Sequence, residues 1–253
     1  KFICASLMSN KDVIYYPQEA ILKAVKKFGT PFFLYEEKRI RENCKRFKGA
    51  FEKYFPDFQA LYAIKANPNP DVMKIIMDEG FTMDASSEAE VWLSEKLGVA
   101  KKFGGVAGMF TGNYTSAETL RYAAERNFIL NLDDISMVKF FDSIGGTGGK
   151  ISVPKILSFR INPGVGKATM KNNVFAGPDA KYGVPFEKAA QAYKLAKEAG
   201  VGRFGIHMMT GSNTLEVEPF ARQVENQLRV AEKICSEAGI GFEFVDIGGG
   251  FGI

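Results

Sequence analysis

Hydrophobic and polar positions recur with two different periods along the chain after residue 55. Short runs rich in β-branched and aromatic residues predict strands, at Gln59–Ile64, Phe81–Asp84, Phe103–Gly108, Phe128–Leu132, Lys155–Ile161, Arg203–Met208 and Phe242–Ile247. Longer stretches with helical spacing predict helices between them, at Asp71–Glu79, Ser87–Leu97, Ser116–Arg126, Ile135–Ile144, Phe186–Ala199 and Glu216–Ala238. Because strands and helices alternate, we expect a parallel sheet, either a barrel or a doubly wound sheet.

Local signals mark several helix ends. Ser86 and Ser87 with Glu90 resemble a capping box at a helix start. Glycines stand where helices should end, at Gly98, Gly200 and Gly239. These signals support the predicted alternation.

The number of strands bears on the kind of fold. Seven strands follow residue 55, whereas a closed (β/α)₈ barrel has eight, and the chain stops at Ile253 directly after the seventh. We therefore expect a fragment of a longer barrel protein. The alternative is that Phe32–Tyr35 is the eighth strand.

Composition and charge exclude several classes of protein. The chain has 253 residues, 46% hydrophobic and 25% charged, which is typical of a globular protein. No apolar run approaches the roughly 18 residues of a membrane span. The net charge of +4 comes from basic residues interleaved with acids, so we expect no nucleic-acid partner and no membrane. In the densest basic stretch, residues 38–48, charge pairs at helical spacing predict a solvated helix face.

Cysteine and histidine usage narrows the chemistry. The three cysteines, Cys4, Cys44 and Cys235, lie far apart without a C-x-x-C pair, so we expect neither a disulfide framework nor a metal site. A reducing cytoplasm is the expected location. His207 is the one histidine, which excludes mechanisms that need several.

Two glycine-bearing segments are predicted as loops. Residues 162–185 show no clear periodicity, and loops of that length are usually functional or mobile. Gly145–Gly149 is predicted to be a flexible turn, because no strand-to-helix context supports a dinucleotide site there.

In β/α barrels the chemistry lies at the carboxyl ends of the strands. Lys65 ends an apolar strand there and is expected to be partly desolvated, which would suit an amine that attacks a carbonyl. On position alone, a lysine that extends from a strand end toward solvent is the more ordinary interpretation. Gly248, Gly249 and Gly250 follow the last strand, and three glycines let backbone N–H groups approach a phosphate.

Four further polar residues occupy comparable positions. Ser212 could add a hydroxyl to the same phosphate or belong to an ordinary turn. Asp84 could cap a helix or partner a charge, with the cap more ordinary. Arg160 lies inside an apolar strand, so it should have an acidic or phosphate partner, in a structural ion pair or a ligand contact. His207 alone is more often a packed histidine than a catalytic one.

Taken together these residues suit pyridoxal 5'-phosphate. The lysine would hold the aldehyde as a Schiff base, and the glycines would hold the phosphate.

Five motifs carry a resemblance to a known family. Tyr62–Asn67 resembles the lysine motif of the fold-type III, alanine-racemase-like pyridoxal phosphate enzymes, and Pro68–Pro70 resembles their decarboxylase branch. Three others resemble diaminopimelate decarboxylases, namely Phe110–Asn113, Asn162–Val165 and Lys181–Pro185. The resemblance runs from about Gly29 to the end of the chain.

The resemblance implies a fold, a cofactor and an activity. The fold would be α/β, a pyridoxal phosphate-binding TIM-like (β/α)8 barrel over residues 37–253, with seven of its eight strands in this chain. Residues 1–36 would belong with a C-terminal β-domain that is absent here. The reaction would convert meso-diaminopimelate, a small amino-acid substrate, to L-lysine in lysine biosynthesis, and the full-length protein would be a homodimer.

The same resemblance assigns roles to the candidate residues. Lys65 and His207 would be catalytic, with Lys65 forming the Schiff base. The cofactor would also contact Asp84 near the lysine, Arg160 around the ring, and Ser212 and Gly248–Gly250 at the phosphate.

Two departures from the family pattern stand out. Family members usually carry a ring-stacking histidine three residues before the phosphate-binding serine, and here that position is Met209. His207 lies two residues earlier, on the same face of the strand. The residues that the family supplies from its last barrel strand and β-domain would lie beyond Ile253, so we expect this chain to hold the cofactor without completing a catalytic cycle.

Other functions stay open at this stage. One is a decarboxylase for ornithine, arginine or carboxynorspermidine. Another is a relative that binds pyridoxal phosphate without catalysis, which Met209 would fit. A phosphosugar barrel enzyme would explain the glycines but not the lysine motif.

Overall fold

A computed structural model describes residues 17–141, 151–164 and 182–252. The chain divides into two compact units, Lys1–Arg39 and Ile40–Ile253, which are treated separately below. The predictions for Gly145–Gly149, and for residues 165–181 of the long connection, lie outside the described residues.

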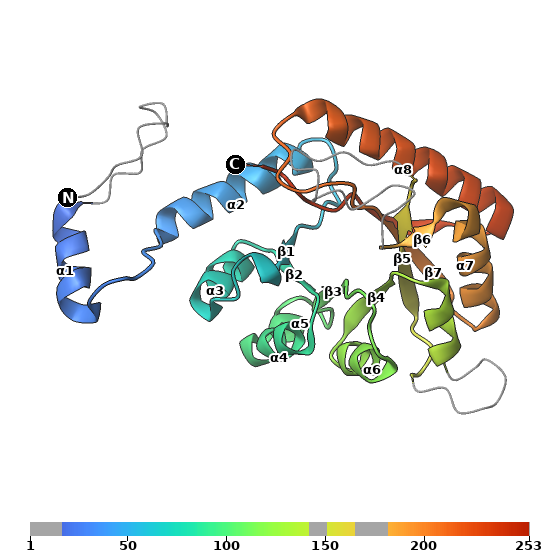
Figure 1. The fold of residues 1–253 in the computed structure, drawn as a ribbon, viewed down its shortest axis with the longest axis horizontal. Coiled ribbons are helices and arrows are strands. Elements are labelled where there is room, and N and C mark those ends of the chain that lie inside the picture. Colours follow the sequence, from blue (N-terminus) through green and yellow to red (C-terminus); the bar gives the residue numbers. More distant parts are fainter. Residues whose placement is uncertain (1–16, 142–150, 165–181, 253) are drawn as a thin grey trace. The chain divides into compact units, whose positions relative to one another are not determined.

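A parallel sheet forms the centre of the second unit. Its main row follows the order of the chain: β1 (Leu61–Ala63), β2 (Thr82–Ala85), β3 (Gly108–Phe110), β4 (Phe128–Leu132), β5 (Ile156–Asn162), β7 (Arg203–His207) and β8 (Phe242–Asp246). A two-residue strand, β6 (Val184–Pro185), pairs with β5 beside this row. The parallel order confirms the predicted number of seven barrel strands (Figure 1).

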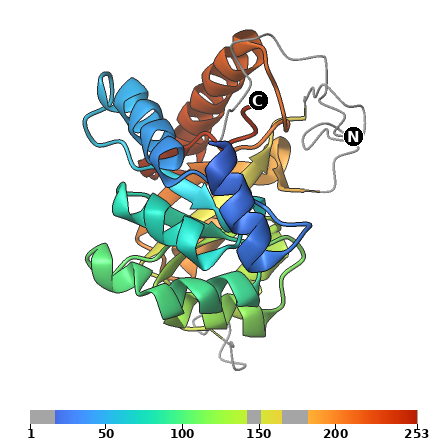
Figure 2. The ribbon, with the colours of Figure 1, turned by 90° about the vertical axis from the view of Figure 1, so that its left-hand side faces the viewer.

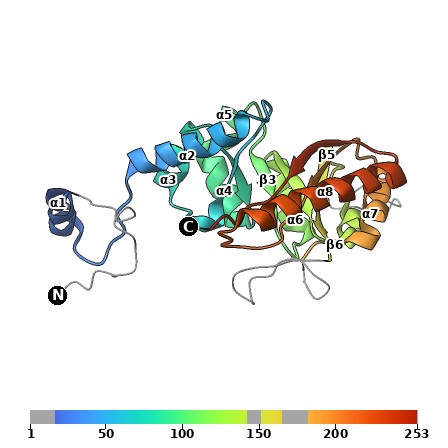
Figure 3. The same ribbon diagram turned by 90° about the horizontal axis from the view of Figure 1, so that it is seen from above.

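Helices connect successive strands and lie along the outside of the sheet. They are α3 (Pro70–Asp78), α4 (Glu88–Leu97), α5 (Val99–Lys102), α6 (Ala117–Glu125), α7 (Phe186–Glu198) and α8 (Val217–Ala238). Figure 2 shows α3, α4 and α6 next to one another, and Figure 3 shows the long α8 with α7 at its side. A barrel built from β/α units produces this arrangement, because each helix returns the chain to the start of the next parallel strand.

The two faces of the sheet have opposite character, since successive side chains of a strand point to opposite faces. One face is apolar, and its side chains pack with the helices in one buried cluster that includes Met83, Phe110, Leu130, Leu157 and Ile206. The other face carries polar side chains, which include Asp84, Asn131, Ser158, Arg160 and His207. The candidate side chains within the strands, Asp84, Arg160 and His207, therefore lie on the face turned away from the helices.

Helix ends follow the sequence signals. The Ser87 hydroxyl accepts a hydrogen bond from Glu90 N at 3.4 Å, while Glu90 Oε2 accepts from Ser86 N at 2.6 Å. Gly98 and Gly239 end α4 and α8 in the left-handed conformation, with φ of 71° and 61°. The capping box and these two C-caps are confirmed.

Three predicted elements differ in the structure. The strand expected at Phe103–Gly108 is wrong: Gly104 and Gly105 turn the chain with positive φ, and β3 begins only at Gly108. The region expected as the helix Ile135–Ile144 is a 3-10 helix, η2 (Ile135–Phe140), in its described part. Residues 32–35, the alternative eighth strand, form no strand.

The helix α2 (Glu37–Glu52) reaches from the first unit into the second, where residues 40–52 lie. Its buried Cys44 and its Phe47 pack in a second apolar cluster with Ala60, Ile76 and Phe81. Phe47 also meets Phe251 edge to face at 5.9 Å, so the segment after β8 reaches the helix before β1. The row of strands thus curves back toward its own beginning.

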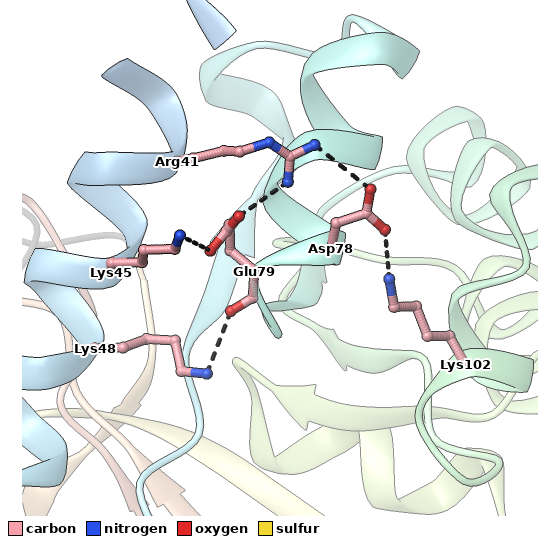
Figure 4. A network of polar contacts seen from close by, with 6 residues as sticks. All are labelled: Arg41, Lys45, Lys48, Asp78, Glu79 and Lys102. Carbon is pink, nitrogen blue, oxygen red and sulfur yellow. Dashed lines mark hydrogen bonds and ion pairs between the residues drawn. The ribbon is translucent and has the colours of Figure 1, made fainter. Parts of the chain in front are cut away.

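Polar contacts fix α2 to the end of α3 (Figure 4). Arg41 Nη1 lies 2.9 Å from Glu79 Oε1, and Lys48 Nζ donates to the Glu79 carbonyl at 3.2 Å. Asp78 Oδ1 is 2.6 Å from Lys102 Nζ on α5. The stretch predicted to form a solvated helix face is mostly exposed. Two of its basic side chains, Arg41 and Lys48, also hold α2 against the end of α3.

The first unit contains a helix that the sequence pattern did not predict, α1 (Gln18–Phe28), which ends at Gly29. Within the described ranges, no helix combines the length and apolar character that crossing a membrane requires.

Candidate active site

Lys65 lies directly after β1, on a 3-10 turn, η1 (Ile64–Ala66). The strand was expected to run to Ile64 but ends at Ala63, which pairs with Asp84 on β2. The Lys65 side chain is exposed, so the expected desolvation is wrong. Its charge nevertheless contributes to lowering the pKa values of Asp84 and His207, two residues of the polar face of the sheet.

Asp84 lies on β2, on the polar face of the sheet. Burial of its carboxyl group raises its pKa to about 7, and the nearby Asp246 adds to this rise. A hydrogen bond from Thr111 Oγ1, at 2.7 Å, and the charge of Lys65 oppose it. The helix-cap alternative is excluded, because Ser87 caps α4. Asp84 therefore changes protonation near neutral pH.

His207 is buried at the end of β7 and neutral at pH 7. Burial lowers its pKa to about 4, although the carboxylate of Asp246 favours the charged form. Its Nδ1 lies 3.0 Å from Nδ2 of Asn131, which is also buried. Since the amide N–H donates to Nδ1, the proton of the neutral ring lies on Nε2.

Arg160 is a buried cation between several of the sequence motifs. Its guanidinium lies 5.2 Å from the centre of the Tyr182 ring, and its Nη1 lies 3.5 Å from Asn113 Oδ1. Burial lowers its pKa, while Asp133, Tyr182 and Asp84 favour the charged form. Asp133 and Asp84 are thus the acidic neighbours that the sequence predicted, and arginine keeps its charge at neutral pH.

The glycine loop and Ser212 lie together. Thr214 N donates to the Gly250 carbonyl at 2.9 Å, and Gly252 N donates to the Thr214 carbonyl at 2.8 Å. These bonds pair the segment after β8 with the segment after β7, which carries Ser212. Gly248 and Gly250 have φ of 70° and 86°, a conformation that favours glycine.

Met209, at the position where the family pattern has a stacking histidine, lies against this loop. Its sulfur accepts a hydrogen bond from Gly249 N at 3.4 Å, and a Cβ at Gly248 would come within 3.0 Å of it. The thioether therefore touches the loop predicted to bind phosphate.

Sequence reasoning missed residues that support these groups. They are Asn131, Thr111, Asp246 and the two buried glutamines of α8, Gln223 and Gln227. Asp246 had a signal, because it ends a strand directly before the glycines. The others act through contacts across strands or from a helix, which one sequence does not reveal.

The residues present fit pyridoxal phosphate. Lys65 offers an amine for the aldehyde, and Ser212 and the glycine loop offer small donors for the phosphate. A Cβ at Gly249 would meet no heavy atom within 4 Å, so this part of the loop is open to an approaching group. Asn131 Oδ1 and Ser158 Oγ are buried on the polar face without a hydrogen-bond partner among the described residues, which leaves polar atoms available to a ligand.

The protein is a parallel β/α barrel in which a lysine and a glycine loop follow the carboxyl ends of the strands. These features are typical of barrels that bind a phosphorylated aldehyde. Residues 37–253 match the family model described as "Pyridoxal-dependent decarboxylase, pyridoxal binding domain". The chain belongs to this family.

Known proteins resemble the chain over most of its length. The diaminopimelate decarboxylase of Methanothermobacter thermautotrophicus is 35% identical over 227 residues, which cover 90% of this chain and 51% of that protein. Protein TabA of Pseudomonas amygdali pv. tabaci is 31% identical over 89% of this chain and 50% of its own length. The chain spans about half the length of the curated relatives it matches.

A solved structure shows the same fold. The diaminopimelate decarboxylase from Helicobacter pylori complexed with L-lysine superposes with a TM-score of 0.76 at 25% identity, over 92% of this chain and 57% of that one. Together with the family model, this confirms the predicted pyridoxal phosphate-binding TIM-like barrel and its cofactor.

Proposed function

We propose that this protein decarboxylates meso-diaminopimelate to L-lysine with pyridoxal phosphate, and that Lys65 holds the cofactor. The observation that carries the proposal is the position of Lys65 directly after β1, two residues from Ala63, which pairs with Asp84 on β2. The glycine loop follows the same carboxyl ends of the strands. The family match supports the decarboxylase class, and relatives named diaminopimelate decarboxylase support the substrate.

Each residue has a definite task in this proposal. Bound pyridoxal phosphate supplies an electron sink for the electron pair left behind when a carboxylate departs. Ser212 and the loop Gly248–Gly250 bind the phosphate through the serine hydroxyl and backbone N–H groups of the loop. The Gly248 N–H is not one of these donors, because it is bonded to Asp246 Oδ1. Arg160, charged and buried, orients negatively charged groups on the polar face.

Two groups handle protons. Asp84, with a pKa of about 7, can hold or release a proton at its carboxyl oxygens near neutral pH. His207, with a pKa of about 4, stays neutral and offers the N–H of Nε2 as a donor. A neutral imidazole adds no positive charge beside Lys65 and Arg160.

A second candidate is a protein that binds pyridoxal phosphate without turnover. The observation that favours it is Met209 against the glycine loop, because a thioether cannot replace the flat ring of a histidine. Other amino-acid substrates are alternatives within the first proposal.

Product analysis separates these functions. Full-length protein is purified and incubated with pyridoxal phosphate together with one of four substrates, meso-diaminopimelate, ornithine, arginine or carboxynorspermidine. The decarboxylation product of each substrate is then measured by mass spectrometry. We expect L-lysine to form from meso-diaminopimelate at least about tenfold faster than the products of the other three substrates form. This factor is a rough estimate of how strongly one well-placed polar contact discriminates between substrates. Preference for another substrate contradicts the assignment. Cofactor uptake without any product supports the second candidate.

We further propose a cytoplasmic homodimer with a domain boundary near residue 36. The widely spaced cysteines support the location, and the family model, which starts at residue 37, supports the boundary. Light scattering of the purified protein would give the mass of the assembly.

A further inference from the structure

Two glutamines of α8 are buried where a barrel helix normally packs apolar side chains. Gln223 and Gln227 lie one turn apart, and the two residues are 6% and 0% exposed. The buried residues further along the same helix are apolar, for example Val230 and Ile234. Burying an amide is costly unless it is hydrogen-bonded, so this pair needs a reason.

The glutamines bind main-chain carbonyls at the carboxyl ends of two neighbouring strands. Gln227 Nε2 donates to the Asp246 carbonyl at 2.8 Å. Gln223 Nε2 donates to the carbonyls of Met208, at 3.2 Å, and Ile247, at 2.5 Å. Its Oε1 in turn accepts a hydrogen bond from the Thr210 hydroxyl. One helix face therefore holds both chain segments at the point where they leave the sheet.

These bonds fix the direction of the groups that face the site. In a trans peptide the C=O and N–H point in opposite directions, so holding the Ile247 carbonyl on α8 also turns the Gly248 N–H away from α8. That N–H donates to Asp246 Oδ1 at 2.7 Å. Asp246 pairs with His207 in the strand register and influences its pKa.

We propose that Gln223 and Gln227 form an amide clamp that positions the glycine loop for the phosphate of the cofactor. The clamp also sets the separation of the segments that carry Met209, Ser212 and Gly248–Gly250. Both glutamines are positioning residues, since they touch backbone and not the cofactor. The inference rests on the proposed function, because it concerns the same cofactor.

The test compares pyridoxal phosphate with pyridoxal, which lacks the phosphate. Gln223→Met keeps the length of the side chain and removes its hydrogen bonds. Gln191→Met, at an exposed position of α7, is the matched control. Dissociation constants for both compounds are measured by absorbance titration of the wild type and each variant.

We expect Gln223→Met to weaken binding of pyridoxal phosphate about tenfold, the effect of losing roughly one well-formed hydrogen bond, while binding of pyridoxal changes less than about twofold. Gln191→Met should change neither. Equal weakening of both compounds by Gln223→Met would show a structural role and overturn the clamp, as would unchanged binding of both.

A second variant tests the clamp if Gln223→Met does not fold. Gln227→Met removes the other arm of the clamp, its hydrogen bond to the Asp246 carbonyl, so it should show the same selective loss. A wild-type protein that binds neither compound would overturn the proposed function and the clamp together. A wild type that binds pyridoxal phosphate, beside variants that bind it equally well, would overturn the clamp alone.

Discussion

Asn131 and His207 are joined by a buried hydrogen bond that spans one strand. They lie on β4 and β7, with β5 between them, and the amide nitrogen of Asn131 is 3.0 Å from Nδ1 of His207. The bond directs the N–H of the neutral ring, at Nε2, away from the amide. His207 therefore presents a single tautomer, with the proton on Nε2, to the polar face of the sheet.

Because His207 is the one histidine in the chain, its state can be read directly by NMR with ¹⁵N-labelled histidine. We expect the Nε2–H tautomer, with no protonation until the pH falls toward about 4. Asn131→Asp should raise the pKa of His207 by more than about one unit, since a neighbouring carboxylate favours the imidazolium.

Asn43→Asp, at an exposed position of α2, is the control and should leave the His207 signals unchanged. An Nδ1–H tautomer in the wild type, or a pKa near that of free histidine, would contradict the assigned hydrogen bond.

Sequence periodicity predicted most of the fold for a physical reason. The strand Phe128–Leu132 was found with its observed ends, because a strand buried in a barrel must be largely apolar. The strand Phe242–Ile247 was found within one residue of its observed end, although its residues are only partly buried or exposed. The strand at residues 103–108 failed, because apolar neighbours masked the turn that Gly104 and Gly105 form. Composition does not separate a turn from a strand when both are apolar.

The candidate site was predicted in part. Lys65, Asp84 and His207 stand at strand ends, so position in the chain was sufficient to find them. Their support was not predictable: Asn131 reaches His207 across an intervening strand, and Gln223 reaches the loop from a helix face. Such contacts depend on strand order and register, which follow only from the folded chain.

The glycine loop allows a matched pair of substitutions. Gly249→Ala adds a methyl group that meets no atom within 4 Å, whereas in Gly250→Ala it would lie 2.3 Å from the Gly211 carbonyl oxygen at a positive φ. We expect Gly249→Ala to leave the thermal unfolding midpoint unchanged and to weaken binding of pyridoxal phosphate about tenfold, by crowding the phosphate.

Gly250→Ala should instead lower the free energy of unfolding by roughly 1–3 kcal/mol, the usual cost of a strained backbone position. Thermal melts and cofactor titrations of both variants check this. Unchanged cofactor affinity in Gly249→Ala would argue against the loop as the phosphate site.

Asp84 and His207 should affect the pH dependence of the free energy of unfolding in opposite directions. The pKa of Asp84 is raised from 3.8 to about 7 on folding, so its contribution to stability is full at low pH and is lost as the pH rises through 7. The pKa of His207 is lowered from 6.5 to about 4, so its contribution is full above pH 6.5 and is lost as the pH falls toward 4.

Substituting one of the two residues should leave only the pH dependence that the other contributes to stability. Between pH 4.5 and 6.5, the free energy of unfolding of Asp84→Asn should fall with decreasing pH relative to the wild type, by up to about 1.4 kcal/mol per pH unit. His207→Gln should change in the opposite direction. Urea unfolding of the cofactor-free proteins measures both slopes, and three parallel curves would refute the assigned shifts.

The attachment of the cofactor to Lys65 is the central claim, and one labelling experiment tests it most directly. The protein is incubated with pyridoxal phosphate, reduced with borohydride and digested, and the modified peptide is identified by mass spectrometry. Lys65→Ala is compared with Lys74→Ala, which removes an exposed lysine of α3. The account predicts a pyridoxyl group on Lys65 in the wild type and in Lys74→Ala, and none in Lys65→Ala. A wild type without an adduct, or with an adduct on another lysine, would contradict it.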